Sequence, residues 1–429
     1  MSNERHSTSG TQMHDLMTTL YPICRSITGD GVRETLRTYQ QQIPLTIHEV
    51  PSGTPVFDWT VPDEWNIRDA YVANARGERV IDFREHSLHV LNYSIPFRGV
   101  LPLSELKKHL HTLPDRPDWI PYKTSYYSPA WGFCLRHKDL LKLEDGDYEV
   151  VMDTTLQPGS LTYGELVLPG ATRDEVLFST HICHPSLCND NLSANLVAVW
   201  LAQHLQTVER RYTYRFLFIP GTIGAITWLA LHEAELPHIK QGLVLTNLGD
   251  GGSFTYKKTR AGDSEIDRLM QFALAENGAP HRTIDFYPYG YDERQYNSPG
   301  IRLPVGGFFR SEHNSFPEYH TSGDNLSFVT ATALEESLEK LKRVVYLLEH
   351  NRRYVNLAPM GEPQLGKRGI YKSISELGEN RFSPMAMFWV LNFSDGSHDL
   401  LAIAQRSGIA FDELARAAAL LKQQGLLDG

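Results

Sequence analysis

The feature that most restricts the fold is a regular alternation of apolar segments between residues 175 and 248. Strands are predicted at 175–182, 214–219 and 242–248, and helices are predicted between them at 192–205 and 223–233. Strands that alternate with helices form an α/β sheet with helices on both faces. Ligands bind to such sheets beyond the carboxyl ends of the strands. His181, Gly221 and Asp250 each close or follow a strand, so we expect them at one rim.

The flanking segments differ in character, which indicates several domains. A chain of 429 residues exceeds what one hydrophobic core usually supports. Aromatic residues, prolines and a hairpin signal at Arg76-Gly77 predict a mostly β insert, and three short helices near the C-terminus resemble a winged helix. The expected domains are the N-terminal part of the core at 1–55, the β insert at 56–148, the core at 149–364 and the winged helix at 365–429.

Charge and composition restrict the partners. The chain has 41 Lys and Arg against 51 Asp and Glu, and this net charge of -10 argues against nucleic acid as the main partner. The last predicted helix of the winged-helix module, 411–424, is neutral, so a protein-contact or packing role is favoured over DNA binding.

Cysteine usage and hydropathy restrict the compartment. The 4 cysteines are too few for a disulfide framework, which favours a reducing cytoplasm. The first ten residues are polar, and the most apolar segment, 216–231, is shorter than a membrane helix requires. We therefore expect a cytoplasmic protein without a membrane partner.

Three polar clusters on predicted strand-end loops carry the side chains for chemistry. The first runs from His181 to Asp190, the second contains His320 and Asp324, and the third is Asp292-Glu293-Arg294-Gln295. Imidazole and carboxylate groups that converge on one point form a zinc site. Each cluster alone also fits a solvated loop, and Asp190 also fits a helix cap. Three such clusters at one sheet rim raise the expectation that they share a site.

These motifs resemble the aminopeptidase-like proteins of the M28 zinc peptidase clan. The matching positions are the strand-end His181, Asp190-Asn191-Leu192-Ser193-Ala194, Asp250, and His320-Thr321-Ser322-Gly323-Asp324. The chain is more similar still to a bacterial subfamily with an inserted β domain and a C-terminal winged helix. The motifs shared with that subfamily include Phe57-Asp58-Trp59-Thr60, Ser125-Tyr126-Tyr127 and Trp131-Gly132-Phe133-Cys134.

The resemblance implies an α/β aminopeptidase-like core, of the phosphorylase/hydrolase-like type, and a set of site residues. Its metal ligands for one or two zinc ions would be His181, Asp190, Asp250 and His320, with His184 in reserve. Glu293 would be the catalytic carboxylate, and Arg294 and Asn191 would bind substrate. The implied substrate is a small peptide or an aminoacyl or acyl metabolite, and a homo-oligomer is compatible with the sequence.

Gly221 departs from the pattern of the relatives. They carry glutamate at this position, which activates the attacking water. Three hypotheses follow: a zinc-dependent hydrolase of amide bonds, compatible with a biosynthetic role; a catalytically degenerate, metal-binding assembly protein; and a single-zinc cyclase. A deciding observation is whether another carboxylate replaces the missing glutamate.

Overall fold

The computed structural model describes residues 8–370 and 382–429, which form two compact units divided between Lys342 and Arg343. The first unit is organised around an eight-stranded sheet with the order β1-β10-β12-β11-β13-β16-β14-β15. The pairs of β11 with β12 and β13, β13 with β16 and β14 with β15 are parallel. The strands are β1 Thr46–Pro51, β10 Ser160–Leu168, β11 Glu175–His181, β12 Thr213–Ile219, β13 Ile239–Leu245, β14 Phe254–Lys257, β15 His281–Ile284 and β16 Val305–Phe309.

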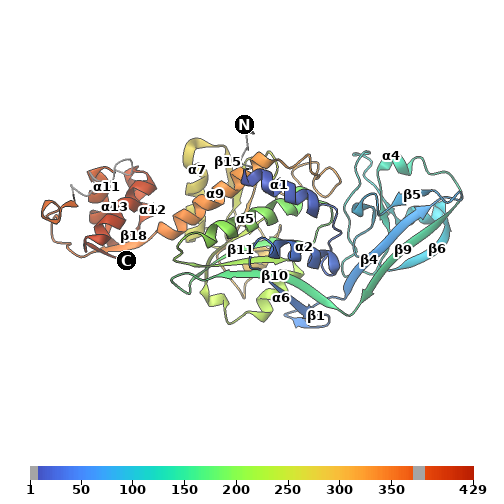
Figure 1. Ribbon diagram of the computed structural model, residues 1–429, viewed down its shortest axis with the longest axis horizontal. Helices are drawn as coiled ribbons and strands as arrows, with labels where there is room; N and C mark the ends of the chain where they lie inside the picture. The colour runs from blue at the N-terminus through green and yellow to red at the C-terminus, as the bar shows by residue number, and fades with distance from the viewer. Residues whose placement is uncertain (1–7, 371–381) are drawn as a thin grey trace, which may run out of the picture. The chain divides into compact units, whose positions relative to one another are not determined.

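Helices cover both faces of this sheet. Figure 1 shows α1, α5 and α9 on one side and α6 on the other. The central strands β11 and β12 are buried along their whole length, as expected for strands covered on both faces. The helices of this unit include α1 Ser9–Leu20, α2 Asp30–Gln40, α5 Ala194–Gln206, α6 Ile223–Leu231, α7 Glu265–Ala275, α8 Glu293–Tyr296 and the start of α9 Ala331–His350. The predicted α/β fold class is confirmed.

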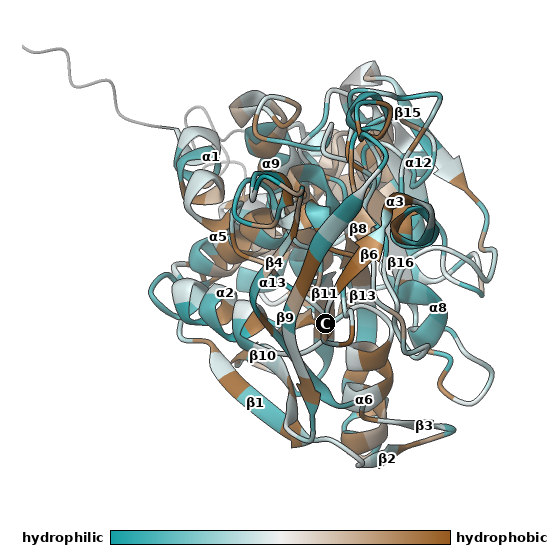
Figure 2. Ribbon diagram, turned by 90° about the vertical axis from the view of Figure 1, so that its right-hand side faces the viewer, coloured by the Kyte–Doolittle hydropathy of each residue, from teal (hydrophilic) through white to brown (hydrophobic). Residues whose placement is uncertain are grey.

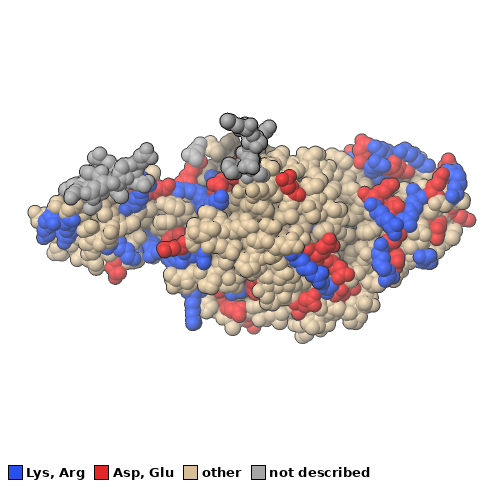
Figure 3. Space-filling model, in the orientation of Figure 1, with Lys and Arg blue, Asp and Glu red and all other residues tan. Residues whose placement is uncertain are grey.

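The insert forms its own antiparallel sheet with the order β5-β4-β9-β6. In Figure 2, β9 alternates between hydrophobic and hydrophilic residues, which is typical of a sheet with one packed and one solvated face. Acidic and basic side chains are mixed on its surface in Figure 3. One ion pair of the insert joins Arg68 to Asp153. The strands are β4 Glu64–Ala73, β5 Arg79–Asp82, β6 Phe97–Pro102 and β9 Asp147–Gln157, with the small pairs β2 Pro55–Val56, β3 Trp59–Thr60 and β7 Leu110–His111, β8 Phe133–Cys134.

The second unit has the architecture of a winged helix. Three helices pack together beside a three-stranded sheet with the order β18-β17-β19. The three predicted helices are confirmed, and the second of them, α12, begins at Leu400, directly after the short strand β18. The elements are β17 Arg353–Asn356, α11 Pro384–Phe393, β18 Asp395–Asp399, α12 Leu400–Ser407, α13 Phe411–Gln423 and β19 Leu427–Asp428.

Within residues 8–370 and 382–429, none of the helices combines the length and the apolar character needed to cross a membrane.

Candidate metal site and catalytic cavity

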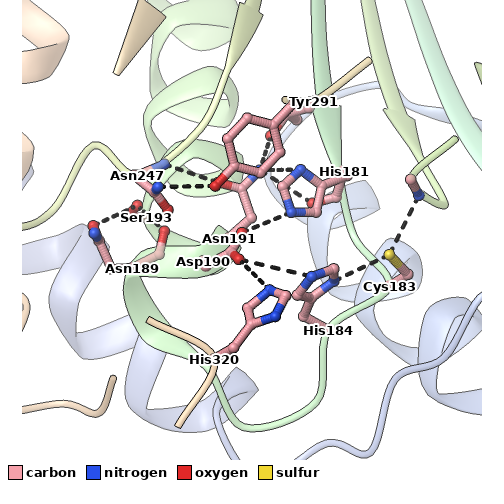
Figure 4. A network of polar contacts seen from close by, with 12 residues as sticks. His181, Cys183, His184, Asn189, Asp190, Asn191, Ser193, Asn247, Tyr291 and His320 are labelled. Carbon is pink, nitrogen blue, oxygen red and sulfur yellow. Dashed lines mark hydrogen bonds and ion pairs between the residues drawn. The ribbon is translucent and has the colours of Figure 1, made fainter. Parts of the chain in front are cut away.

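The candidate site is built around the buried carboxylate of Asp190, which three histidines surround (Figure 4). His181 Nε2 lies 2.8 Å from Asp190 Oδ1, and His320 Nε2 lies 3.0 Å from Asp190 Oδ2. His184 Nε2 lies 3.7 Å from the same Oδ2 atom. One donor atom each from His181, His184 and Asp190 lies within 4.8 Å of the others. The structure thus brings together His181, Asp190 and His320 and adds His184, the reserve candidate.

The fold delivers these side chains from three separate segments. His181 is the last residue of β11, and Asp190 lies in the tight turn that leads into α5. His320 lies in the loop between β16 and α9 and has a φ angle of 53°. Few residues other than glycine adopt such a backbone conformation, and those that do are concentrated at functional sites.

Asp250 is held by hydrogen bonds from other segments. Its carboxylate accepts hydrogen bonds from Asn189 Nδ2 at 2.8 Å and from Ser311 Oγ at 2.7 Å. Asp324 accepts hydrogen bonds from the backbone N–H groups of Asn189 and Asp190, at 2.6 and 2.9 Å. Asp324 therefore fixes the backbone that carries Asp190, whereas Asp250 holds the side chain of Asn189. Burial raises the pKa of Asp324 to about 8, although these N–H groups lower it.

The ring of His181 is held from two sides. Asn191 Nδ2 lies 3.2 Å from His181 Nδ1, and the ring of Tyr291 stacks on the imidazole with centroids 5.2 Å apart. Asn191 also donates a hydrogen bond to Thr180 Oγ1 at 2.8 Å and is buried. Asn191, which we expected to bind substrate, thus lies where it can orient a metal-binding histidine.

The donor set around Asp190 fits a zinc ion. Burial would raise the pKa of Asp190, but the neighbouring His184 and His181 hold it well below its usual range. None of the Lys and Arg residues described by the structure forms an ion pair with Asp190. A buried carboxylate without a cationic partner is costly, whereas one carboxylate with neutral imidazoles is a typical zinc site. Asp190, His181, His184 and His320 are therefore the residues that could hold the metal.

Gly221 lies just beyond the end of β12, close to Cys183 and His181, and the residue after it is Thr222, not a carboxylate. A Cβ atom at Gly221 would lie 3.4 Å from Cys183 Sγ and 3.7 Å from His181 Cβ. The next residue, Thr222, has a φ angle of 63°, which is unusual for a β-branched residue. Its N–H group donates a hydrogen bond of 2.7 Å to Asp292 Oδ1. A carboxylate from another segment therefore lies beside Gly221, the position where the resemblance implies a glutamate.

Asp292 lines a cavity of about 370 Å³ that is also lined by His181, His184 and Gly221. Burial raises the pKa of the Asp292 carboxyl to about 6, while His181 and the N–H group of Thr222 lower it. A carboxyl group with a pKa near neutrality can accept and return a proton at physiological pH. The sequence signal for this residue was the same acidic cluster in which our expectation fell on its neighbour, Glu293.

The side chains of Glu293 and Arg294, although adjacent in sequence, have different surroundings. Glu293 Oε1 forms a buried ion pair of 2.8 Å with Lys257 Nζ, and Glu293 is not among the residues that line the cavity. Arg294 does line it, and its Nη2 atom donates a hydrogen bond of 3.2 Å to Thr222 Oγ1. The guanidinium is thus available at the cavity, whereas the Glu293 carboxylate is occupied by Lys257.

The insert contributes directly to the site, through side chains that the sequence did not identify. The Tyr122 N–H group donates a hydrogen bond of 2.8 Å to the carbonyl oxygen of His320, and Ser322 N–H donates one to Ile120 at 2.8 Å. The ring of Tyr122 lies 5.0 Å from the rings of both His184 and His320. The insert also supplies aromatic walls of the cavity, namely Trp59, Tyr126 and Tyr127, opposite Tyr291 and Tyr319 of the core.

Comparison with solved structures identifies the fold of the first unit. A zinc aminopeptidase from Bacillus subtilis is 13% identical, with a TM-score of 0.57 over 79% of this chain and 94% of that chain. A peptidase M28 precursor from Shewanella amazonensis is 12% identical, with a TM-score of 0.53 over 79% of this chain and 92% of that chain. The predicted resemblance to M28-type zinc aminopeptidases is confirmed at the level of fold.

Nearer relatives cover the whole chain. A Clostridium acetobutylicum protein named as a polysaccharide biosynthesis protein with an aminopeptidase-like domain is 50% identical over 99% of this chain and 98% of its own. A crystal structure of a peptidase from the same organism is 50% identical and has a TM-score of 0.92 over 98% of this chain and 97% of that chain. Residues 352–429 match the winged helix-turn-helix family, and residues 14–351 match the family described as domain of unknown function DUF4910. The chain therefore belongs to the DUF4910 family and carries a C-terminal winged helix.

Proposed function

We propose that this protein is a zinc-dependent hydrolase that cleaves an amide bond in a small peptide or in an aminoacyl or acyl metabolite. The observation that carries the proposal is the cluster in which His181, His184 and His320 surround the buried Asp190. The aminopeptidase-like fold supports the same reaction class. A bound zinc ion would supply Lewis acidity for the carbonyl group and for water.

Asp292 is the proton carrier in this proposal, in place of Glu293. Its Oδ1 atom is held by Thr222 N–H, and the carboxylate lines the cavity shared with His181 and His184. Asp292 takes a proton from the attacking water as the carbon–oxygen bond forms. It returns that proton to the nitrogen as the carbon–nitrogen bond breaks, so the carboxylate ends in its starting state.

The other cavity residues bind and orient the substrate. Arg294, held by Thr222 Oγ1, offers its guanidinium to a carbonyl or carboxylate oxygen of the substrate. Trp59 and Tyr127 pack edge to face, with ring centroids 5.3 Å apart, and shield the cavity from water. Such walls suit an acyl group or an amino acid side chain with an apolar part.

A biosynthetic role is our preferred setting for the reaction. The Clostridium acetobutylicum relative is named for polysaccharide biosynthesis, and aminoacyl or acyl amides occur on sugars as well as on peptides. The winged helix would then contact protein or pack within an assembly instead of binding DNA. In α13, Asp412 and Glu413 balance Arg416 and Lys422, so the helix carries no net positive charge for a phosphate backbone.

The proposal is tested by zinc analysis and by a panel of aminoacyl and N-acyl amides, both peptide and amino-sugar. Asp292→Asn should retain zinc and lower kcat by a factor of about 10² to 10⁴. Asp285→Asn, an exposed carboxylate paired with Lys258, is the matched control and should leave kcat unchanged. Glu293→Gln should mainly lower stability, because it leaves the buried ammonium of Lys257 without its negatively charged partner.

Two outcomes would change the assignment. A fast Asp292→Asn enzyme together with an inactive, folded Glu293→Gln enzyme would transfer the proton-carrier role to Glu293. A zinc-loaded wild type that cleaves no member of the panel would favour a metal-binding assembly protein over a hydrolase.

A further inference from the structure

A second cavity, of about 520 Å³, lies on the insert side of His320. The side chain of His320 is 35% exposed, and His320 lines this cavity while its Nε2 atom contacts Asp190. Tyr122, which packs near His184 and His320, lines it as well. His320 therefore borders both the Asp190 cluster and the second cavity, and Tyr122 packs beside it.

The lining of this cavity is basic. It contains Lys108, Lys123, His109 and His111 and not a single Asp or Glu. Lys108 is neutralised by Glu105 at 2.6 Å, but Lys123 forms no ion pair within the described part of the chain. A lysine of this kind offers its charge to a ligand.

His111 lies beside the positive charges that line this cavity. It is half-buried, and in the described ranges neither of its ring nitrogens has a hydrogen-bond partner. Burial lowers the pKa of His111, and the neighbouring charges of Lys123 and His109 lower it further. An anion placed between these groups would gain a charge-assisted contact with Lys123 and a hydrogen bond from the imidazole.

Recognition in this cavity cannot rest on stacking. Trp131 is covered on one face by Phe97, with ring centroids 4.1 Å apart, and on the other by His109, at 3.8 Å. With both faces occupied, the indole has none left for a base or a sugar ring. The lining also contains hydroxyl groups, among them those of Thr124, Ser125 and Ser128, which suit an oxygen-rich group.

We propose that this cavity is a subsite for an anionic oxygen group of the substrate, a phosphate or a carboxylate, with Lys123 and His111 as its principal contacts. The proposal rests on the proposed function for the reaction at Asp190, but the binding itself does not require turnover. It narrows the substrate to amides that carry a negative charge on the part lying beyond His320.

The test is calorimetric titration of the zinc-loaded protein with methyl phosphate, acetate and, as a neutral probe, methanol. Lys123→Gln should weaken binding of the preferred anion about tenfold, the cost of losing one charge-assisted contact. Lys142→Gln, another exposed insert lysine that pairs with Asp139 and does not line the cavity, should leave it unchanged. An anion bound only at the zinc would be equally insensitive to both substitutions. His111→Asn provides a second variant, and the Tm of each variant verifies folding.

Each outcome decides the question. Tighter binding of methyl phosphate than acetate assigns a phosphorylated substrate, and the reverse assigns a carboxylated one; both support the subsite. Equal affinities of Lys123→Gln and Lys142→Gln, or methanol binding as tightly as the anions, would overturn it. A zinc-loaded protein that cleaves amides but binds neither anion refutes only the subsite, whereas anion binding by a protein that holds no zinc refutes only the hydrolase.

Discussion

The two ends of strand β11 show two ways of burying a carboxylate. At the amino end, Glu175 and Glu165 share Arg215, whose Nε atom lies 2.7 Å from Glu175 and whose Nη1 atom lies 2.5 Å from Glu165. The indole N–H of Trp228 donates a further hydrogen bond of 3.0 Å to Glu165. At the carboxyl end, beyond His181, the carboxylate of Asp190 is surrounded by imidazoles alone.

The difference separates a structural ion cluster from a cluster that could hold an external cation. Buried carboxylates are tolerated when a cation and hydrogen bonds compensate for the lost hydration. Arg215 supplies that cation from within the chain, so the amino end is complete. The carboxyl end has imidazole and carboxylate groups, but none of the described Lys and Arg residues pairs with Asp190 there. This end also lies at the rim where α/β sheets bind ligands.

The largest expected effect comes from removing the Arg215 cation at the amino end of β11. Arg215→Met leaves Glu165 and Glu175 buried without a cation, and it should lower the free energy of unfolding by about 3–5 kcal/mol. Urea denaturation of the zinc-free protein measures this change. Lys240→Met is the control, because Lys240 is half-exposed and lies 3.9 Å from Asp174; it should cost less than about 1 kcal/mol. Similar losses for the two variants would mean that the Arg215 cluster is not the structural centre we describe.

Substitution of Asp190, beyond the carboxyl end of β11, should change the zinc affinity of the protein and not its stability. Asp190→Asn removes the central ligand and should lower zinc affinity by more than about 100-fold, since even residues that only orient ligands contribute 10–100-fold. The zinc-free variant should unfold at a denaturant concentration close to that of wild type, because the amide oxygen can still accept a hydrogen bond from a neighbouring imidazole. Competition with a fluorescent chelator gives the affinity. Unchanged zinc binding would contradict the assignment of Asp190.

Local periodicity was sufficient to predict the core of the fold. The strand expected at 175–182 is β11 Glu175–His181, and the helix expected at 192–205 is α5 Ala194–Gln206. These elements are buried over most of their length, so their apolar residues identify them without reference to tertiary contacts. The motifs likewise placed His181, Asp190 and His320 around one point.

Side-chain direction and long-range contacts could not be predicted in this way. The strand-end position of Asp250 predicts the rim on which it lies. It does not predict that the carboxylate accepts a hydrogen bond from Asn189. Asp292 and Glu293 are adjacent, and only the start of the short helix α8 decides which one faces the cavity. Tyr122 reaches the site through docking of the insert, for which local sequence carries no signal.

A smaller effect should follow from loosening the support of Asp190 while keeping every ligand. Asp324→Asn replaces one acceptor oxygen with an N–H₂ group that faces the backbone N–H of Asn189 or Asp190. The turn that carries Asp190 should shift, and zinc affinity should fall about 10–100-fold. Asp263→Asn, at an exposed carboxylate of the same unit, serves as the control. Equal zinc affinity in wild type and Asp324→Asn would show that the turn keeps its geometry without this carboxylate.

The smallest effect, and the finest test of the contrast, concerns Gly221. Its position has room for a side chain, since an added Cβ would meet only ordinary contacts with Cys183 and His181. In the Asp292→Asn background, Gly221→Glu should therefore restore a proton acceptor beside the cluster and raise kcat about tenfold, a fraction of the general-base contribution. Gly221→Gln in the same background has a similar size but cannot take a proton, so it should restore nothing. Equal rescue by Glu and Gln would show that residue 221 acts by filling space, and the proton would then have to be carried by a group other than Asp292.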